Sequence, residues 1–174
     1  MVWLLENFGG AAEPTVAWQM DTYGHSAAQA ALSAQSGLKG MFISRMHYQE
    51  YERRKEAKEL EFTWHVEEEQ IFTGVLFEGY TAPSGFCFDT SCDDPPMVAD
   101  PESSEYNLPE RLASILEHLE EQSSHYTSGH IMLTMGGDFA FQNAEQYFAN
   151  LDLLMELVNT NSSGFEMVYS TPSR

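Results

Sequence analysis

The segment from residue 15 to residue 45 constrains the fold most, because it combines two short apolar runs with one helical pattern. Thr15–Met20 and Gly40–Arg45 are predicted buried strands. Between them, Ser26–Ser36 is an alanine-rich predicted helix that ends at Gly37. Two strands joined through a helix over so short a distance form a parallel βαβ unit. The chain is therefore expected to build a parallel sheet with helices on its faces.

Strand and helix patterns continue to alternate along the rest of the chain, which indicates an α/β fold with a largely parallel sheet and flanking helices. The expected helices are Tyr48–Leu60, a helix that Asn107 can cap, and Asn143–Val158, and the expected strands are Glu61–Trp64, His130–Met135 and Phe165–Ser170. The inner positions of the two later helices are Leu112, Ile115, Leu116, Leu119, Phe148, Leu151, Leu154 and Met155. No internal repeat or linker divides the pattern, so residues 1–174 are expected to form a single domain.

Between Phe72 and Asn107 the sequence has no regular period and is rich in Gly, Pro, Ser and Asp. An irregular segment of this length inside a domain is usually functional or disordered, and its many aromatic residues argue against disorder. Those aromatics are Phe72, Phe77, Tyr80, Phe86 and Phe88. They are expected either to line a sugar-binding wall or simply to pack in the core, and the sequence leaves both interpretations open.

The charge of the chain excludes some partners. The net charge is -19 over 174 residues, and residues 1–58 carry six acids and six bases, whereas residues 59–174 carry 21 acids and two bases. Such an acidic surface repels phosphate backbones and anionic lipid, so neither nucleic acid nor membrane is an expected partner. No apolar run is long enough to span a membrane, and the first residues lack the pattern of a secretion signal.

Two cysteines and one sequon bear on the compartment. Cys87 and Cys92 are spaced to close a small loop by a disulfide, although in a cytosolic protein such a pair would more often be two free thiols. Asn161, followed by Ser162 and Ser163, forms an N-glycosylation sequon in a polar turn. Together they suggest a glycoprotein that has passed through the secretory route.

Two carboxylates occupy positions where α/β proteins place their chemistry. Asp21 and Asp138 each follow a predicted buried strand and each precede a predicted helix. If these strands are parallel, both side chains lie at the carboxyl edge of the sheet, where ligands bind. From position alone, Asp21 is equally well explained as a residue that merely caps the turn.

Several motifs occur in the order expected for one enzyme family. They are Ala17-Trp18-Gln19-Met20-Asp21-Thr22-Tyr23-Gly24-His25-Ser26, Arg45, Phe72-Thr73-Gly74-Val75-Leu76 leading to Tyr80, the pair Cys87 and Cys92, and Met135-Gly136-Gly137-Asp138-Phe139. The chain resembles glycoside hydrolase family 38, the class II α-mannosidases, and in particular their lysosomal branch. The resemblance implies a fragment of a (β/α) barrel-like N-terminal catalytic domain, a lysosomal location and a disulfide between Cys87 and Cys92.

The resemblance also assigns the two carboxylates. Asp21 matches the catalytic nucleophile, which is also a zinc ligand, and Asp138 matches the acid/base. A retaining glycosidase needs such a pair about 5 to 5.5 Å apart. The implied activity is hydrolysis of terminal α-D-mannose from mannose-containing oligosaccharides of the N-glycan type.

Supporting residues match as well. Arg45 corresponds to an arginine that pairs with the nucleophile, and a guanidinium beside the Asp21 carboxylate would keep it ionised. Tyr23 and Tyr80 match aromatic positions that contact the sugar or a catalytic carboxylate. His25 is interpreted as a hydrogen-bonded structural histidine rather than a zinc ligand.

Zinc is the cofactor that the resemblance implies, but of its four family ligands this sequence supplies only Asp21. The others are expected before Met1 and beyond Arg174, in the rest of the parent catalytic domain. One carboxylate cannot hold Zn²⁺ with useful affinity. The isolated chain is therefore expected to show little or no activity, and a targeting segment is expected outside it.

Parts of the sequence raise two other interpretations. Gly136-Gly137-Asp138-Phe139 superficially resembles a motif of enzymes that make cyclic dinucleotides, but the acidic, base-poor surroundings would repel a nucleotide, so this interpretation is rejected. A truncated, non-catalytic product that binds sugar or a partner chain remains the alternative function.

Overall fold

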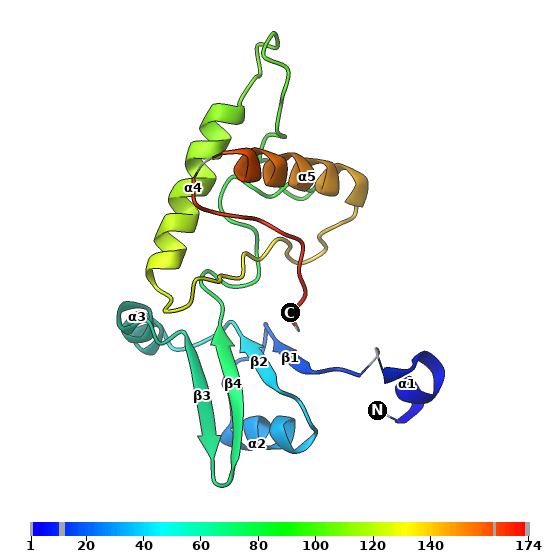
Figure 1. Ribbon diagram of the computed structural model, residues 1–174, viewed down its shortest axis with the longest axis vertical. Coiled ribbons are helices and arrows are strands. Elements are labelled where there is room, and N and C mark those ends of the chain that lie inside the picture. Colours follow the sequence, from blue (N-terminus) through cyan, green and yellow to red (C-terminus); the bar gives the residue numbers. More distant parts are fainter. Residues whose placement is uncertain (1, 11–12, 162, 173–174) are drawn as a thin grey trace. The chain divides into compact units, whose positions relative to one another are not determined.

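The computed structural model describes residues 2–10, 13–161 and 163–172. The chain divides into two units, one formed by residues 1–77 and 171–174 and the other by residues 78–170. The first unit holds the sheet and the second is built on two long helices (Figure 1). The fold is mixed α/β, as predicted, whereas a barrel-like closure stays a prediction.

In the described part of the first unit, four strands form one sheet in the order β1-β2-β4-β3 (Figure 1). The strands are β1 (Val16–Gln19), β2 (Gly40–Ile43), β3 (Glu61–Val66) and β4 (Glu69–Val75). β1 pairs in parallel with β2 and β2 in parallel with β4, while β3 and β4 form an antiparallel hairpin. The sheet is therefore mostly parallel.

The predicted βαβ unit is confirmed. Its helix is α2 (Ala27–Gln35), which begins after Ser26, whose Oγ accepts a hydrogen bond from Ala28 N at 3.0 Å. It ends at a turn where Gly37 has φ +86°, a conformation that glycine adopts without strain. Ala30 and Ser33 are the buried positions of α2, and the helix contacts β2, β3 and β4.

Two further helices complete the first unit. α1 (Val2–Phe8) is short, and α3 (Tyr48–Ala57) is charged and largely exposed. On α3, Glu50 accepts hydrogen bonds from Arg53 and, at 2.7 Å, from Arg54. The hydrogen bond from Arg53 is the main reason that the pKa of Glu50 falls to about 2. The carboxylate of Glu50 therefore stays ionised at acidic pH values where an ordinary glutamate would take up a proton.

The irregular segment begins later than predicted. Phe72–Val75 belongs to β4, because Phe72 pairs with both Gly40 of β2 and Thr63 of β3, and Val75 pairs with Ile43. Thr73 and Val75 are almost fully buried. A strand that is buried between two partner strands does not need to alternate apolar and polar residues, which is the pattern by which a half-exposed strand is recognised in a sequence. The Gly, Thr and Val residues of this segment therefore gave only a weak signal for a strand.

One face of the sheet carries an aromatic row of Trp18, Phe42 and Phe72. The ring centroids of Trp18 and Phe42 are 5.7 Å apart, and those of Phe42 and Phe72 are 6.0 Å apart. Gly74 pairs with Phe42 across the sheet, and the Phe42 ring lies over it. The absence of a side chain at Gly74 makes room for the row.

Gly74→Ala is expected to lower the free energy of unfolding by about 1 to 3 kcal/mol, because the new methyl group would overpack this face. A Cβ at this position would lie 2.5 Å from Phe42 Cε1. Urea unfolding followed by tryptophan fluorescence measures the effect, since Trp3, Trp18 and Trp64 all lie in the first unit. Gly10→Ala is the matched control because a Cβ there meets nothing within 4 Å. Equal stability of the two variants would contradict the prediction.

The second unit packs α4 (Leu108–Ser124) and α5 (Ala144–Thr160) around an apolar core. The buried members of that core are Phe86, Phe88, Met97, Ile115, Leu119, Tyr147, Leu151, Leu154 and Val158. The predicted inner stripe of α4 is confirmed by Ile115 and Leu119. On α5, Leu151 and Leu154 are confirmed, but Phe148 was wrongly placed inside, since it is 46% exposed and Tyr147 is buried instead.

Asn107 precedes α4 as predicted, but its side chain does not cap the helix. Its Oδ1 accepts from Val98 N at 2.9 Å and its Nδ2 donates to Pro96 O at 2.9 Å. The amide is thus used to hold the preceding loop. Pro109, in the first turn of α4, needs no N–H partner, which reduces the demand for a cap.

Two predicted strands, His130–Met135 and Phe165–Ser170, are not strands in the structure. Each is held by side-chain hydrogen bonds. Thr134 Oγ1 donates to the carbonyl oxygens of Gly79 and Thr81, both at 3.1 Å. The Asn159 amide both donates to Met167 O and accepts from Met167 N. Part of each segment packs against the core, through Ile131, Leu133, Met135, Phe165 and Met167, whereas Val168 and Tyr169 are exposed. Among the described residues, neither segment forms the backbone ladder that a strand requires.

Candidate functional site

Asp21 lies just beyond the end of β1, in the loop that leads to α2. Arg45, just beyond the end of the neighbouring strand β2, reaches across to it. Arg45 Nε and Nη2 both donate to Asp21 Oδ1, at 2.9 and 2.5 Å. Because both bonds end on one oxygen, the Oδ2 atom lies outside this ion pair. The side chain of Asp21 is 72% exposed, so the carboxylate is accessible to a ligand.

The arginine is itself held in place by two neighbours of Asp21. The Arg45 guanidinium lies over the Tyr23 ring, 4.5 Å from its centroid. The imidazole of His25 is hydrogen-bonded through Nε2 to Arg45 O at 2.6 Å. His25 is thus a hydrogen-bonded histidine that links the two loops, as the sequence indicated. Asp21, Tyr23 and Arg45 are brought together by the parallel pairing of β1 with β2.

Asp138 lies in the second unit, at the start of a turn that leads to α5. Tyr80 Oη donates a hydrogen bond to Asp138 Oδ1 at 3.3 Å. The predicted contact between this tyrosine and a candidate catalytic carboxylate is therefore present. The chain entering the turn is held beside residues 79–82, because Ala82 N also donates to Gly136 O at 3.2 Å.

The two carboxylates do not both follow strands of the sheet, which corrects the sequence argument. Asp21 follows β1, whereas the residues before Asp138 belong to none of the described strands. Asp21 belongs to the first unit and Asp138 to the second. The separation of about 5 to 5.5 Å that a retaining mechanism requires stays a prediction.

Apart from Phe72, which belongs to β4, the aromatic residues of the irregular segment resolve into two groups. Phe77, Phe86 and Phe88 are buried, with at most 5% of their surface exposed, so they pack in the cores and cannot line a sugar-binding wall. Tyr80 is half-buried beside Asp138 and is the member of the set that contacts a candidate site residue.

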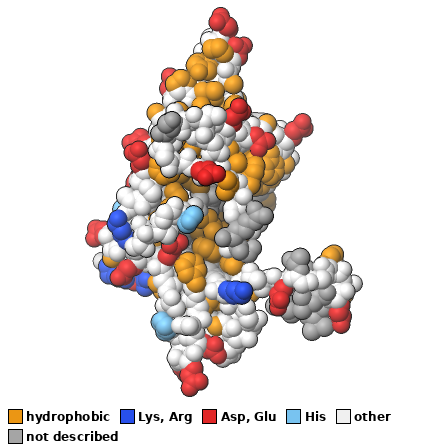
Figure 2. Space-filling view, in the orientation of Figure 1, with side chains coloured by type: hydrophobic (Ala, Val, Ile, Leu, Met, Phe, Trp, Pro, Cys, Tyr) orange, Lys and Arg blue, Asp and Glu red, His pale blue; other side chains and the backbone are white. Residues whose placement is uncertain are grey.

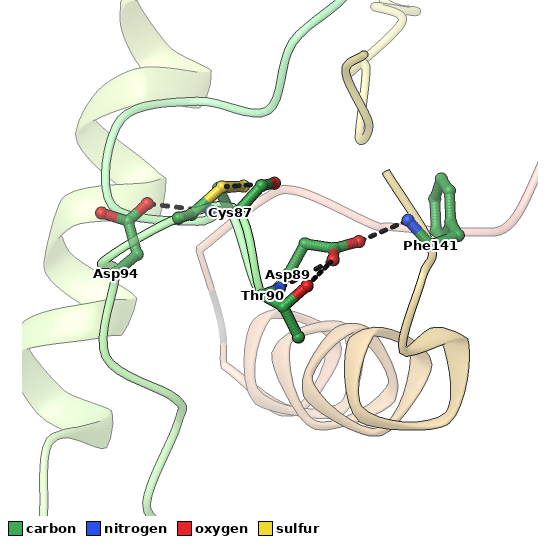
Figure 3. The surroundings of a disulfide bond; sticks show 7 residues. Cys87, Asp89, Thr90, Asp94 and Phe141 are labelled. Carbon is green, nitrogen blue, oxygen red and sulfur yellow. Dashed lines mark hydrogen bonds between the residues drawn. A yellow bond between two sulfur atoms is a disulfide. The ribbon is translucent and has the colours of Figure 1, made fainter. Parts of the chain in front are cut away.

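Cys87 and Cys92 form a disulfide, as predicted, with their Cα atoms 5.9 Å apart (Figure 3). Asp94 Oδ2 accepts a hydrogen bond from Cys87 N at 3.0 Å, which tightens the same loop. The loop also carries the core residue Phe88. Closing it reduces the conformational freedom of the unfolded chain.

Replacing both Cys87 and Cys92 by serine is expected to destabilise the second unit by about 2 kcal/mol, the entropy expected for so short a closed loop. Far-UV circular dichroism during urea unfolding measures this, since α4 and α5 lie in that unit. The control is reductant, which should destabilise the natural chain and leave the double variant unchanged. An unaltered midpoint in the double variant would refute the structural role.

Sequence reasoning missed three polar residues on which the second unit depends. Asp89 is 5% exposed and accepts a hydrogen bond from Phe141 N. Asn150, on the inner side of α5, accepts from Met97 N at 2.7 Å. Gln122 of α4 donates to Met132 O at 3.0 Å. Their positions in the sequence could have revealed them. Asn150 and Gln122 fall on the apolar faces of their helices, and Asp89 lies between the two cysteines, where a buried polar group needs a hydrogen-bond partner.

The sequon lies at the end of α5, where Asn161 is exposed. Its middle residue, Ser162, lies outside the described residues. Glycosylation of Asn161 therefore stays a prediction.

Acidic side chains are spread over the displayed surface of both units, with few Lys or Arg side chains among them (Figure 2). None of the helices within residues 2–10, 13–161 and 163–172 has the length and apolar character of a membrane span. Within the same ranges, no three His, Cys, Asp or Glu side chains gather where they could hold a metal ion. By themselves, these residues do not fit zinc, which takes three or four protein ligands.

Comparison with known proteins places the chain among the glycoside hydrolases. It belongs to glycosyl hydrolases family 38, because the model of that family's N-terminal domain matches residues 1–174. It is 41% identical to the lysosomal alpha-mannosidase of Cavia porcellus and 40% identical to that of Homo sapiens, in each case over 98% of this chain. The lysosomal alpha-mannosidase of Dictyostelium discoideum is 38% identical over the same share. The chain spans 17 to 18% of the length of these relatives.

Proposed function

We propose that this chain carries both catalytic carboxylates of a retaining α-mannosidase that releases terminal α-D-mannose from N-glycan-type oligosaccharides. The observation that supports this most is the Asp21 and Arg45 pair in a chain of family 38. Arg45 binds Oδ1 and orients the carboxylate, while the Asp21 side chain remains largely exposed to solvent. An oriented and accessible carboxylate is what nucleophilic attack on a sugar requires.

In the proposed first step, Asp21 Oδ2 attacks the anomeric carbon of mannose and forms an ester bond to it. The bond between that carbon and the leaving oxygen breaks as Asp138, in its protonated form, gives its proton to the oxygen. In the second step, the Asp138 carboxylate takes a proton from a water molecule, which attacks the same carbon and breaks the ester. Two displacements at one carbon retain the α configuration.

The other members of the site have positioning roles in this proposal. Tyr80, through its hydrogen bond to Oδ1, holds the Asp138 carboxyl group. Tyr23 packs on the Arg45 guanidinium, and the residue is 81% exposed, so that it can contact a sugar. His25 holds the Arg45 backbone.

We further propose that Asp21 supplies one ligand of a zinc ion whose other ligands lie outside the described residues, and that the protein acts in the lysosome. Names of relatives support the location, since those above are lysosomal alpha-mannosidases. Metal analysis of the natural full-length protein tests the zinc proposal directly. One zinc per protein, lost in an Asp21→Ala variant, would support it.

The decisive experiment incubates the natural full-length protein with an α-mannoside and follows the sugar by proton NMR. The proposal requires that α-mannose appear before any β-mannose. First appearance of the β anomer would exclude the double displacement. A protein that binds mannosides but never hydrolyses them would instead support the non-catalytic alternative.

A further inference from the structure

Asp89 is a buried carboxylate that the proposed reaction does not use. It lies inside the loop closed by the Cys87 and Cys92 disulfide, and the residue is 5% exposed. Its Oδ1 accepts from Thr90 N at 2.7 Å and from Thr90 Oγ1 at 3.2 Å. Its Oδ2 accepts from Phe141 N (Figure 3). A buried carboxylate needs such donors, since burial alone strongly disfavours its charge.

The hydrogen bond from Phe141 N to Asp89 joins residues far apart in the sequence, unlike the two hydrogen bonds from Thr90. Thr90 is the chain neighbour of Asp89, whereas Phe141 is 52 positions away and lies three residues after Asp138. The Asp89 carboxylate therefore joins the disulfide loop to the turn on which the proposed acid/base is carried.

That turn has an unusual backbone that needs outside support. Phe139 and Phe141 have φ values of +59° and +65°, in the left-handed region that L residues with bulky side chains rarely adopt. Such conformations persist where surrounding contacts hold them, and they often occur at functional sites. The hydrogen bond from Phe141 N to Asp89 is one such contact.

Aromatic packing supports the turn from another side. The Tyr147 ring on α5 lies with its centroid 4.6 Å from that of Phe141 and 6.0 Å from that of Phe88. Burial, reinforced by the charges of Asp89 and Asp94, raises the pKa of Tyr147. Phe88 is adjacent to Asp89 in the disulfide loop, so the loop and the turn share one buried contact region.

We propose that Asp89 is a positioning residue that acts through Phe141 N–H to hold the turn of Asp138 in the geometry required for proton transfer. The inference rests on the proposed function, since it assumes that Asp138 is the acid/base. The competing role is purely structural, in which Asp89 stabilises the second unit without any specific effect on the proton transfer. The two roles differ in how they depend on the leaving group.

The test uses the natural full-length protein and two substrates, methyl α-mannoside and 2,4-dinitrophenyl α-mannoside. Methoxide is a poor leaving group and needs a proton as the bond breaks, whereas dinitrophenolate leaves without one. Asp89→Asn keeps the shape but puts an NH₂ group in place of one acceptor oxygen. We expect kcat/KM for the methyl glycoside to fall about 10- to 100-fold, because small displacements of a catalytic group have effects of this size. For the dinitrophenyl glycoside, we expect a change of less than about 3-fold.

Asp94→Ala is the matched control. It removes the carboxylate that accepts from Cys87 N in the same disulfide loop, but it leaves the bond between Asp89 and Phe141 in place. Its two kcat/KM values should stay in the natural ratio. If Asp89→Asn gives no folded protein, Asp89→Glu replaces it, since it keeps the charge and shifts the oxygens by one methylene group.

The ratio of the two kcat/KM values does not depend on how much of a sample is folded, so it separates the two roles. An equal fall with both substrates, or no fall with either, would overturn the positioning role of Asp89. A natural protein that hydrolyses neither substrate would overturn the proposed function itself. A selective loss with the methyl glycoside, in Asp89→Asn or its replacement but not in Asp94→Ala, would support the inference.

Discussion

Asp21→Ala in the natural full-length protein is expected to lower kcat for α-mannoside hydrolysis by about 10⁴-fold or more, since it removes the proposed nucleophile. The substitution also removes the two hydrogen bonds between Arg45 and Asp21. The effect should be the same for substrates with good and poor leaving groups, because both need the nucleophile. Initial rates with methyl and dinitrophenyl α-mannosides measure it.

Azide provides the confirming experiment for Asp21. The alanine side chain leaves room beside the anomeric carbon, and a small anion can attack there from the face that Asp21 used. The product would be β-mannosyl azide, with inverted configuration, from the dinitrophenyl substrate. Glu120→Ala, at an exposed position of α4, is the control and should keep natural kinetics. Turnover by Asp21→Ala within about 10-fold of the natural rate would refute the nucleophile assignment.

Asp138→Ala is expected to lower kcat/KM for methyl α-mannoside by about 10²- to 10⁴-fold, the usual contribution of a general acid. With the dinitrophenyl substrate, kcat/KM should change little, because its leaving oxygen needs no proton. Its kcat should still fall, since the second step lacks a base to activate water. This divided response is what distinguishes loss of the acid/base from loss of the nucleophile.

A milder substitution tests the hydrogen bond that Tyr80 donates to Asp138. Tyr80→Phe removes the hydroxyl group that donates to Asp138 Oδ1 and keeps the ring. It should reduce kcat/KM for the methyl glycoside by about 2- to 13-fold, the value of one ordinary hydrogen bond of about 0.5 to 1.5 kcal/mol, and show the same leaving-group dependence. An Asp138→Ala protein whose losses are equal for the two substrates would refute the acid/base assignment.

Motif order and local pattern predicted much of the candidate site. Asp21, Arg45 and Tyr80 came from a resemblance carried by short motifs, and the structure brings Arg45 to Asp21 and Tyr80 to Asp138. The separation of the two aspartates stays a prediction. Asp89 was not predicted, because its partner is 52 positions away and no local pattern marks that pairing.

The sequence by itself determined the βαβ unit and the helices α3, α4 and α5, but not α1, since a helix or an alternating strand depends on residues near each other along the chain. Only the tertiary structure decided whether an apolar run becomes a strand. Phe72–Val75 does so because β2 and β3 lie on either side of it, whereas His130–Met135 is buried in part but finds no ladder in its unit. Hydrophobic burial can be satisfied by many neighbours, but a backbone ladder and a buried carboxylate each need specific partners, which the fold brings from far along the chain.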